Sequence, residues 1–503
     1  MRKSLLRFLL HRLRGAAVFA ALLFAQAAVA QDITLTARDG GLALNGQLVS
    51  FDGEFYRIET VYGGLTVAAE GVICDGPACP NLTAPLAVID VVGPEGPAGR
   101  LLEPLFAGFA ASRSLGFVPG EVAEVRDPAT GQTLARIRFL PMDDDAALAA
   151  VLSRRASLTI GFVPHSALRN HTLGLEALVP IVAASNMFSV IRSTDLAAAL
   201  SGRVTNWQEI GGPDMPIVVH GLADGVALAA PIRARVGGMP AGPRHFDAAT
   251  LAAVVARDPW AVALTGRSEQ GAARALPLTD ACDFPYAATP LAIKAEDYPL
   301  TAPLFMGVGR YRQPLLLREF LEYLASDTAA AAVVGAGYID RSLGFAPLTQ
   351  DGARLLGAIR NAGAGVDLAA LQRLAAAMTG GQRLSLTFRF QDGSTQLDAH
   401  SADNLADLAR HIGAGRFAGQ DLVLAGFSDG SGAADVNLAL SKNRADAVRA
   451  ALMALAPDLT EAQLPQVKAF GEALPMACDT TATGRQINRR VELWLHPRPS
   501  AAP

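Results

Sequence analysis

The chain has 503 residues, of which 51% are hydrophobic and 18% are charged, and its formal net charge is -4. This length is typical of about three domains with buried cores. The near-neutral balance excludes a protein that binds nucleic acid through a strongly basic surface. The composition therefore indicates a globular chain of several domains.

The first thirty residues (1–30) have the features of a signal peptide. Basic residues precede an apolar run at 16–23, and Ala28-Val29-Ala30 supplies the small residues of a cleavage site. A membrane anchor is the alternative, but the run is shorter than the roughly 20 residues that a spanning helix needs. We expect export, cleavage near Ala30, and a mature chain without a transmembrane segment. No cysteine follows the cleavage site, so a lipid anchor there is not expected.

Four cysteines remain, an even number that favours disulfides in an exported chain. Cys74 and Cys79 flank Asp75-Gly76-Pro77, a turn that can bring the two sulfur atoms together, so we predict this pair. Cys282 and Cys478 are then the two cysteines left to pair with each other, and nothing else in the sequence points to that pair. A zinc site would need further cysteine or histidine ligands nearby, so no metal is expected.

Residues 31–82 are predicted to form a small β module. From Ile33 to about Val72, apolar and polar residues alternate between Asp-Gly and Gly-Gly turns. This pattern is typical of four or five short strands. Nothing in the segment indicates catalysis, and its role is open.

Residues 83–346 alternate between strand-like and helix-like stretches. Strands alternating with helices favour an α/β region with parallel strands. The strands are predicted at 87–92, 157–163, 179–183 and 217–220. The rest of the chain is predicted to comprise a helical segment (347–381), a second α/β segment (382–497) and a disordered tail (498–503). The helical segment is a linker or the start of the last domain.

Short motifs in the middle region mark a family resemblance. Ser201-Gly202 precedes Trp207, Gly211-Gly212 follows it, and Tyr298-Pro299-Leu300 comes later. With these motifs the region resembles the type-2 periplasmic substrate-binding fold, most closely the phosphate-binding component of ABC transporters. The resemblance implies two α/β lobes joined by crossover strands, with a ligand in the cleft between them. We expect Trp207 and Tyr298-Pro299 to serve packing and turns.

The anion chemistry departs from that family. A phosphate site needs helix-start N–H groups, hydroxyl side chains and a nearby arginine. The two loops that supply hydroxyls in the family, here 93–99 and 221–226, contain no serine or threonine. Glu95 and Asp224 would instead place negative charge there, whereas Arg100 could neutralise a ligand or be an ordinary surface residue of a helix. We predict that a small-molecule ligand, if bound, lies near these three residues and that phosphate binding is lost or changed.

Residues 384–495 carry a second and more extensive resemblance. The matching stretches are FRFQDGSTQLDAHSADNLADLARHI, LVLAGFSDGSG, NLALSKNRADAVRAAL and FGEALPMACDTTATGRQINRRVELWL. Together they resemble the OmpA-like C-terminal domain, a peptidoglycan-binding module of βαβαβ type. The resemblance implies that Asp429 and Arg444 bind diaminopimelate of the stem peptide. It also implies that Asn488 and Arg489 line the site and that Ser394 lies in the opening loop.

Arg444 lies on or beside an apolar stripe of its helix, where a guanidinium needs a partner. The stripe is formed by Leu440, Ala447, Val448 and Ala451. The free end of diaminopimelate is a zwitterion, so Asp429 can accept from its ammonium while Arg444 donates to its carboxylate. Alternatively, Asp429 stabilises a glycine-rich turn and pairs with Arg444 inside the protein.

Two neighbouring residues have simpler interpretations. Asn437 is expected to cap the helix that carries Arg444. Arg490 is expected to face outward, because only one of two adjacent strand residues can face a given side.

The sequence favours a non-enzymatic protein of the Gram-negative periplasm, associated with peptidoglycan or the outer membrane. Its partner would be the diaminopimelate stem peptide of peptidoglycan; no nucleic acid and no cofactor is expected. The alternative is the solute-binding component of an ABC uptake system for phosphate or another small anion. An enzyme lacks support, because the chain contains no His-Glu-x-x-His or Gly-x-x-x-x-Gly-Lys motif.

Overall fold

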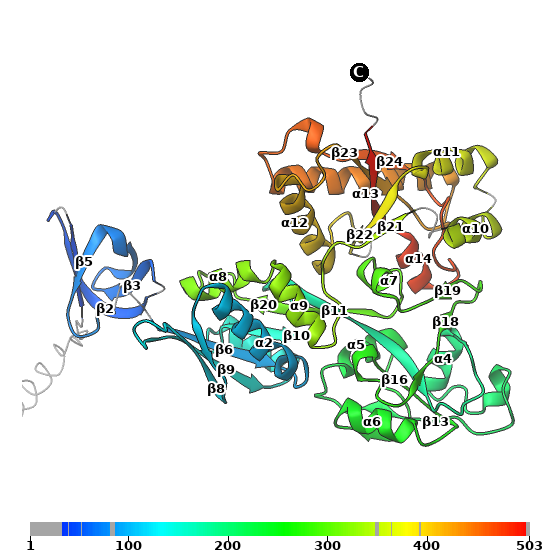
Figure 1. Ribbon diagram of the computed structural model, residues 1–503, viewed down its shortest axis with the longest axis horizontal. Helices are drawn as coiled ribbons and strands as arrows, with labels where there is room; N and C mark the ends of the chain where they lie inside the picture. Colours follow the sequence, from blue (N-terminus) through cyan, green and yellow to red (C-terminus); the bar gives the residue numbers. More distant parts are fainter. Residues whose placement is uncertain are drawn as a thin grey trace, which may run out of the picture. The chain divides into compact units, whose positions relative to one another are not determined.

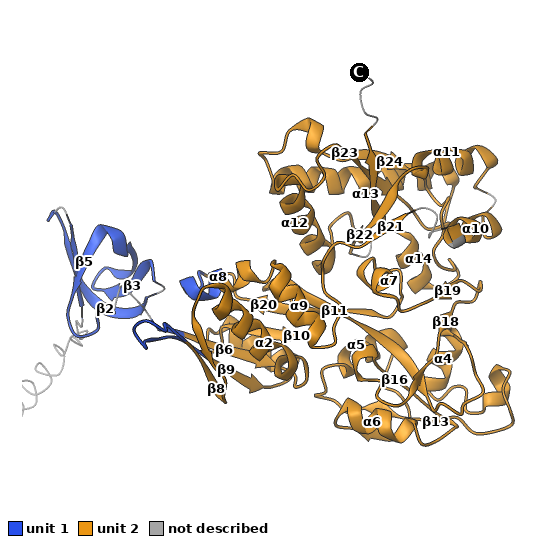
Figure 2. Cartoon of the chain, in the orientation of Figure 1, with its two compact units in different colours: residues 1–87, 126–136, 312–319 blue, residues 88–125, 137–311, 320–503 orange. Residues whose placement is uncertain are grey.

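The computed structural model describes residues 33–498 apart from 39, 52, 81–85, 348–351, 364 and 392–393. The predicted signal peptide and residues 499–503 of the predicted tail lie outside the described residues. The chain divides into two compact units, 1–87 with 126–136 and 312–319, and 88–125 with 137–311 and 320–503 (Figure 2). Among the described helices, none combines the length and the apolar character that crossing a membrane requires.

The N-terminal module is an antiparallel sheet with strand order β4-β3-β2-β1-β5. Its core is built from Ile33, Leu35, Tyr56 and Ile58, which alternate with more exposed residues along β1 and β3. Cys74 and Cys79 form the predicted disulfide beside this core. The expected four or five strands are confirmed as β1 (Ile33–Ala37), β2 (Ala43–Phe51), β3 (Phe55–Thr60), β4 (Gly63–Ala68) and β5 (Val72–Asp75).

The middle region is built on one long sheet with the order β13-β16-β11-β20-β10-β6-β9-β8-β7. Its central strands, β11 (Arg169–Val182) and β20 (Thr301–Val308), run antiparallel to each other and join two groups of elements (Figure 1). The remaining strands of this path are β6 (Ala87–Gly93), β7 (Gly116–Val118), β8 (Val122–Arg126), β9 (Thr133–Pro141), β10 (Leu158–Gly161), β13 (Val218–Val219) and β16 (Ala261–Gly266). The expected parallel pairing is found for β6–β10 and β13–β16 of this sheet and for the short pairs β12–β18 and β14–β15. The long sheet is nevertheless mixed, because β10 and β16 pair antiparallel with β20 and β11.

The two groups are the first and the second lobe of the middle region. The first lobe contains β6 to β10 with helices α2 (Pro97–Ser112), α3 (Asp144–Leu152), α8 (Leu315–Tyr323) and α9 (Asp327–Gly335). The second lobe contains α4 (Ser193–Leu200), α5 (Ala229–Val236), α6 (Ala248–Val255), α7 (Pro290–Lys294) and β12 to β19. The short strands of this lobe are β12 (Ile191–Arg192), β14 (Gly221–Leu222), β15 (Arg244–His245), β17 (Arg274–Ala275), β18 (Leu278–Thr279) and β19 (Pro285–Tyr286).

The family motifs serve packing, as predicted. Trp207 is fully buried and its Nε1 donates to the carbonyl of Trp260 at 3.0 Å. The hydroxyl of Tyr298 donates to the carbonyl of Leu178 at 2.9 Å. Both residues therefore stabilise the second lobe and its crossover strand.

The C-terminal region has its own sheet, with the order β21-β22-β25-β23-β24. The strands are β21 (Phe345–Pro347), β22 (Gln382–Phe388), β23 (Gln420–Gly426), β24 (Gln466–Ala469) and β25 (Val491–Pro497). Alternate residues of β23 and β25 point to opposite faces, so the sheet has two cores. Helices α12 (Ala399–Gly413) and α13 (Ala434–Leu455) cover one face, and α14 (Ala482–Asn488) precedes β25.

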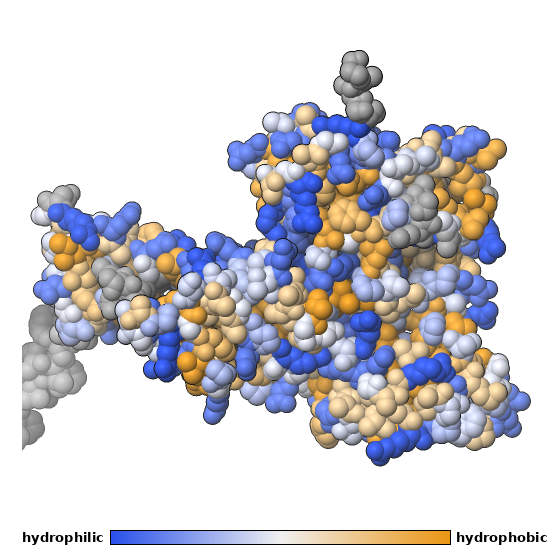
Figure 3. Space-filling model, in the orientation of Figure 1, coloured by the Kyte–Doolittle hydropathy of each residue, from blue (hydrophilic) through white to orange (hydrophobic). Residues whose placement is uncertain are grey.

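The segment predicted as a linker or as the start of the last domain is helical, as expected, and it covers the second face of this sheet. Helices α10 (Gly352–Arg360) and α11 (Leu368–Met378) pack through Ala358, Leu374 and Met378 against Trp494 of β25. Their outer sides carry exposed apolar residues, visible as orange surface over these helices (Figure 3). Leu356, Ile359 and Leu368 are at least 60% exposed, so each helix is buried along one side only.

The C-terminal sheet and the middle region outside 126–136 and 312–319 belong to the same compact unit and are linked by polar contacts and one disulfide. Arg383 of β22 pairs with Asp297 at 2.5 Å, and both side chains are at most 7% exposed. Thr172 of β11 donates through its hydroxyl to Asp403 of α12 at 2.7 Å. The Cys282–Cys478 disulfide joins the second lobe to the segment before α14, which confirms the pairing predicted as the remainder.

Candidate functional site

The predicted ligand carboxylate Asp429 lies at the end of β23, where the chain turns towards α13. Its Oδ1 accepts from the backbone N–H of Ser431 at 3.0 Å, which stabilises the turn. Its Oδ2 lies 3.4 Å from Nη1 of Arg489. Asp429 therefore holds its own loop and pairs with Arg489; no described contact pairs it directly with Arg444.

Helix α13 packs very close to the end of β23. A Cβ atom on Gly426 would lie 2.1 Å from the carbonyl oxygen of Ser441, so only glycine allows this approach. The hydroxyl of Ser441 also accepts from the backbone N–H of Gly471 at 3.0 Å. These contacts bring the face of α13 that carries Arg444 towards the Asp429 loop.

Arg444 is partly buried, and its guanidinium lies over the ring of Phe390 at 5.9 Å from the ring centre. Its Nη1 is buried, and no described residue accepts a hydrogen bond from that atom. Burial lowers the pKa of Arg444, the charge of Arg489 lowers it further, and the charge of Asp429 opposes both effects. Arg444 is thus a partly buried cation, one of whose nitrogens has no hydrogen-bond acceptor among the described residues.

The apolar stripe expected beside Arg444 is confirmed for Val448, which is buried, and for Ala451, which packs against the core of the domain, but it is wrong for Leu440. Leu440 is 42% exposed. The buried face of α13 is formed by Asn437, Ser441, Ala445, Val448 and Leu452. The amphipathic helix was predicted correctly, but its inner face includes small and polar residues that a search for large apolar residues passes over.

Three other predicted residues have clear structural roles. Asn488 is fully buried; its Oδ1 accepts from the N–H groups of Met476 and Ala477, and its Nδ2 donates to Ala477 and Asp479. The contacts of Ser394 lie in its own loop, where its Oγ accepts from the N–H of Gln396 at 2.9 Å. Asn437 does not cap α13, whose N-cap is Ala433; it lies inside the helix and donates to Glu472 at 2.7 Å.

Arg490 does not face outward. It is fully buried, its Nε donates to Glu492 at 2.8 Å, and its guanidinium stacks over Phe427. Burial alone would raise the pKa of Glu492, but Arg354, Arg490 and Arg383 outweigh burial and the net shift is downward. Arg490 therefore belongs to a buried ionic cluster and not to a ligand site.

In the middle region, the three predicted residues Glu95, Arg100 and Asp224 line one cavity of about 1200 Å³. Loops of both lobes contribute to it, and a parallel bridge joins Glu95 to Val226. The acidic side chains that line it are Glu95, Asp143, Asp224, Asp247 and Glu269, whereas Arg100 is the arginine of the described lining. The charged groups of the described lining are thus five carboxylates and one guanidinium.

Arg100 is neither a free ligand cation nor an ordinary surface residue. Its Nη2 pairs with Glu269 at 2.8 Å, its Nη1 donates to Ser268 at 2.9 Å, and its guanidinium stacks on Tyr338. Ser268 in turn donates to the buried Glu176, whose pKa burial raises. The charge of Arg100 is thus paired with that of Glu269. Ser268 is a cavity hydroxyl that the sequence did not reveal, because it comes from neither of the two expected loops.

Comparison with known proteins decides the class of the C-terminal region. Residues 389–489 match the OmpA family. The predicted OmpA-like domain is therefore confirmed. A stretch of 72 residues is 39% identical to the probable lipoprotein YiaD of Escherichia coli (strain K12), covering 14% of this chain and 32% of that protein. The chain thus spans about a third of the length of this relative, and its OmpA domain associates it with the cell envelope.

Half of the chain is similar in fold to solved phosphate-transport proteins. An ABC-type phosphate transport receptor from Vibrio cholerae is 16% identical, covers 50% of this chain and 99% of its own, and gives a TM-score of 0.40. PstS from Borrelia burgdorferi is 13% identical with 50% and 98% coverage and a TM-score of 0.37. At these identities the likeness concerns the fold alone. The multidomain α/β class predicted from the sequence is confirmed by the sheets and helices of the described residues.

Proposed function

We propose that this chain is a non-enzymatic cell-envelope protein that binds peptidoglycan in the periplasm through its OmpA domain, with Asp429 and Arg444 as the ligand-binding pair. The observation that carries the proposal is the buried Nη1 of Arg444, from which no described residue accepts a hydrogen bond. An unsatisfied buried cation is costly, so a ligand carboxylate that meets it gains a charge-assisted hydrogen bond.

The geometry of Asp429 suits the other half of a zwitterion. Charge-assisted bonds between arginine and carboxylate are typically 2.7–2.9 Å long, whereas Arg489 lies 3.4 Å from Oδ2 of Asp429. This longer contact leaves Oδ2 able to accept from a ligand ammonium as well. Two arginines and one carboxylate thus match an ammonium and a carboxylate on one carbon, which is the free end of diaminopimelate.

The middle region is proposed to keep a binding-protein fold without a phosphate site. The charged residues of the described lining of its cavity are five carboxylates and one arginine, and that arginine is already paired with Glu269. Asp224 is balanced by Arg233 and Arg244 at 3.7 and 3.6 Å, outside the cavity lining. A phosphate-uptake receptor, the alternative function, would need a cation left free for its ligand.

Co-sedimentation with purified sacculi tests the proposal. The parent chain should pellet with the sacculi, Arg444→Ala should remain largely in the supernatant, and Arg449→Ala should behave like the parent. Arg449 is the matched control because it lies on the same helix and pairs with the exposed Glu461. Equal pelleting of Arg444→Ala and the parent would exclude Arg444 from the function.

A further inference from the structure

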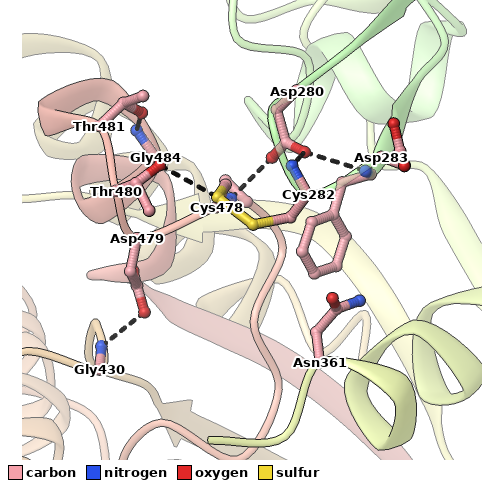
Figure 4. The surroundings of a disulfide bond; sticks show 12 residues. Asp280, Cys282, Asp283, Asn361, Gly430, Cys478, Asp479, Thr480, Thr481 and Gly484 are labelled. Carbon is pink, nitrogen blue, oxygen red and sulfur yellow. Dashed lines mark hydrogen bonds between the residues drawn. A yellow bond between two sulfur atoms is a disulfide. The ribbon is translucent and has the colours of Figure 1, made fainter.

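The Cys282–Cys478 disulfide is set in a dense hydrogen-bond arrangement (Figure 4). The carboxylate of Asp280, 5% exposed, accepts from the N–H groups of Cys282 and Phe284 at 2.9 Å each. Its other oxygen accepts from the N–H of Cys478 at 2.6 Å and from the hydroxyl of Tyr286 at 2.8 Å. The second lobe therefore holds Cys478 through both a covalent bond and a buried carboxylate.

The next residue connects this arrangement to the candidate ligand site. Oδ2 of Asp479 accepts from the N–H of Gly430 at 2.8 Å, and Oδ1 accepts from Nδ2 of Asn488 at 2.7 Å. A Cβ on Gly430 would lie 2.7 Å from the same Oδ2, so the glycine lets the two segments approach closely. Gly430 directly follows Asp429, whose Oδ1 holds the N–H of Ser431. The Asp429 loop is thus held from within and from Asp479.

From these contacts we infer that the second lobe of the middle region is a positioning element of the peptidoglycan site. The disulfide and Asp280 fix Cys478 and Asp479, and Asp479 fixes the loop that presents Asp429. This inference rests on the proposed function. It assigns the middle region a part in wall binding that needs no ligand in its own cavity.

The test uses the full chain and a stem tripeptide ending in diaminopimelate, titrated by calorimetry. Cys282→Ser/Cys478→Ser should bind about three- to tenfold more weakly, the factor expected when one hydrogen bond that orders the loop is lost. Cys74→Ser/Cys79→Ser, the same chemical change in the N-terminal module, should bind like the parent. Asp479→Ala should lose a similar factor with its disulfide intact, and Asp479→Asn, which keeps one acceptor oxygen, should recover part of it.

Amide hydrogen exchange separates positioning from general destabilisation. In Cys282→Ser/Cys478→Ser and in Asp479→Ala, the amide of Gly430 should exchange faster, while the amides of β23 and β25 keep their protection. Faster exchange across the whole sheet with unchanged Gly430 would overturn the inference. So would parent-like affinity of both variants alongside a loss in Arg444→Ala, and in that case the proposed function stands. Parent-like affinity of Arg444→Ala would instead remove the proposed function itself.

Discussion

Replacing Arg444 with alanine should weaken ligand binding without lowering the stability of the free chain. A hydrogen bond to a charged group contributes roughly 1.5–3 kcal/mol, so the affinity for a diaminopimelate stem peptide should fall about tenfold to a hundredfold. The free chain, however, carries Arg444 as a desolvated cation whose Nη1 has no described partner and whose neighbour is Arg489. Removing it relieves a cost, so the free energy of unfolding should stay the same or rise.

The lysine variant sharpens this prediction. An ammonium cannot donate two parallel bonds to a carboxylate, so Arg444→Lys should recover little of the lost affinity although it keeps the charge. Calorimetry gives the affinity and urea unfolding gives the stability of each variant. The reasoning is refuted if Arg444→Ala binds like the parent. It is also refuted if that variant loses the ~3–5 kcal/mol typical of a broken buried ion pair, because Arg444 would then have an internal partner.

Asp429→Ala should weaken stem-peptide binding by a similar factor. The double variant Asp429→Ala/Arg444→Ala should lose less binding free energy than the sum of the two single losses, because both residues hold one ligand group. Fully additive losses would contradict a shared site. Phosphate should bind the full chain weakly or not at all in low-salt calorimetry at neutral pH, and micromolar affinity, about 8 kcal/mol, would show the interpretation of the cavity to be wrong. Glu492→Gln should lower the free energy of unfolding by ~3–5 kcal/mol, because it leaves buried arginines without their shared carboxylate. The control Asp446→Asn, in the exposed pair with Lys442, should lower it by less than about 0.5 kcal/mol. The pKa of Glu492 in the folded chain lies below its unfolded value of about 4.3. Its contribution to the free energy of unfolding is therefore complete above that pH and is lost as the pH falls towards the folded pKa. The free energy of unfolding of Glu492→Gln should depend less steeply on pH in this acidic range, and an unchanged pH dependence in urea unfolding would contradict the assignment.

The parts of the fold that depend on local pattern were predictable. Alternating residues and glycine turns predict the five strands of the N-terminal module, and the five-residue spacing of Cys74 and Cys79 around a turn predicts their disulfide. The direction of the strands in the middle sheet was not predictable in the same way. A long antiparallel strand such as β11, which pairs with β20 along one part and with β16 along another, has no local signal that distinguishes it from a parallel strand.

The two arginines of the C-terminal domain show where local reasoning fails at the site. Alternation along a strand predicted an outward Arg490, but α14 ends at Asn488 and β25 begins at Val491, so residues 489 and 490 lie before the strand and the rule does not apply to them. Glu492 lies two residues from Arg490, but Arg354 and Arg383 come from segments that are distant in the sequence, and only the folded chain brings them to Glu492. Arg444 was singled out by the family resemblance, and its Nη1 is buried without a described hydrogen-bond partner, which is the observation behind its proposed ligand role. The direction of a strand side chain could not predict the role of Arg490, because that role depends on Glu492 and Arg354 meeting in the folded chain.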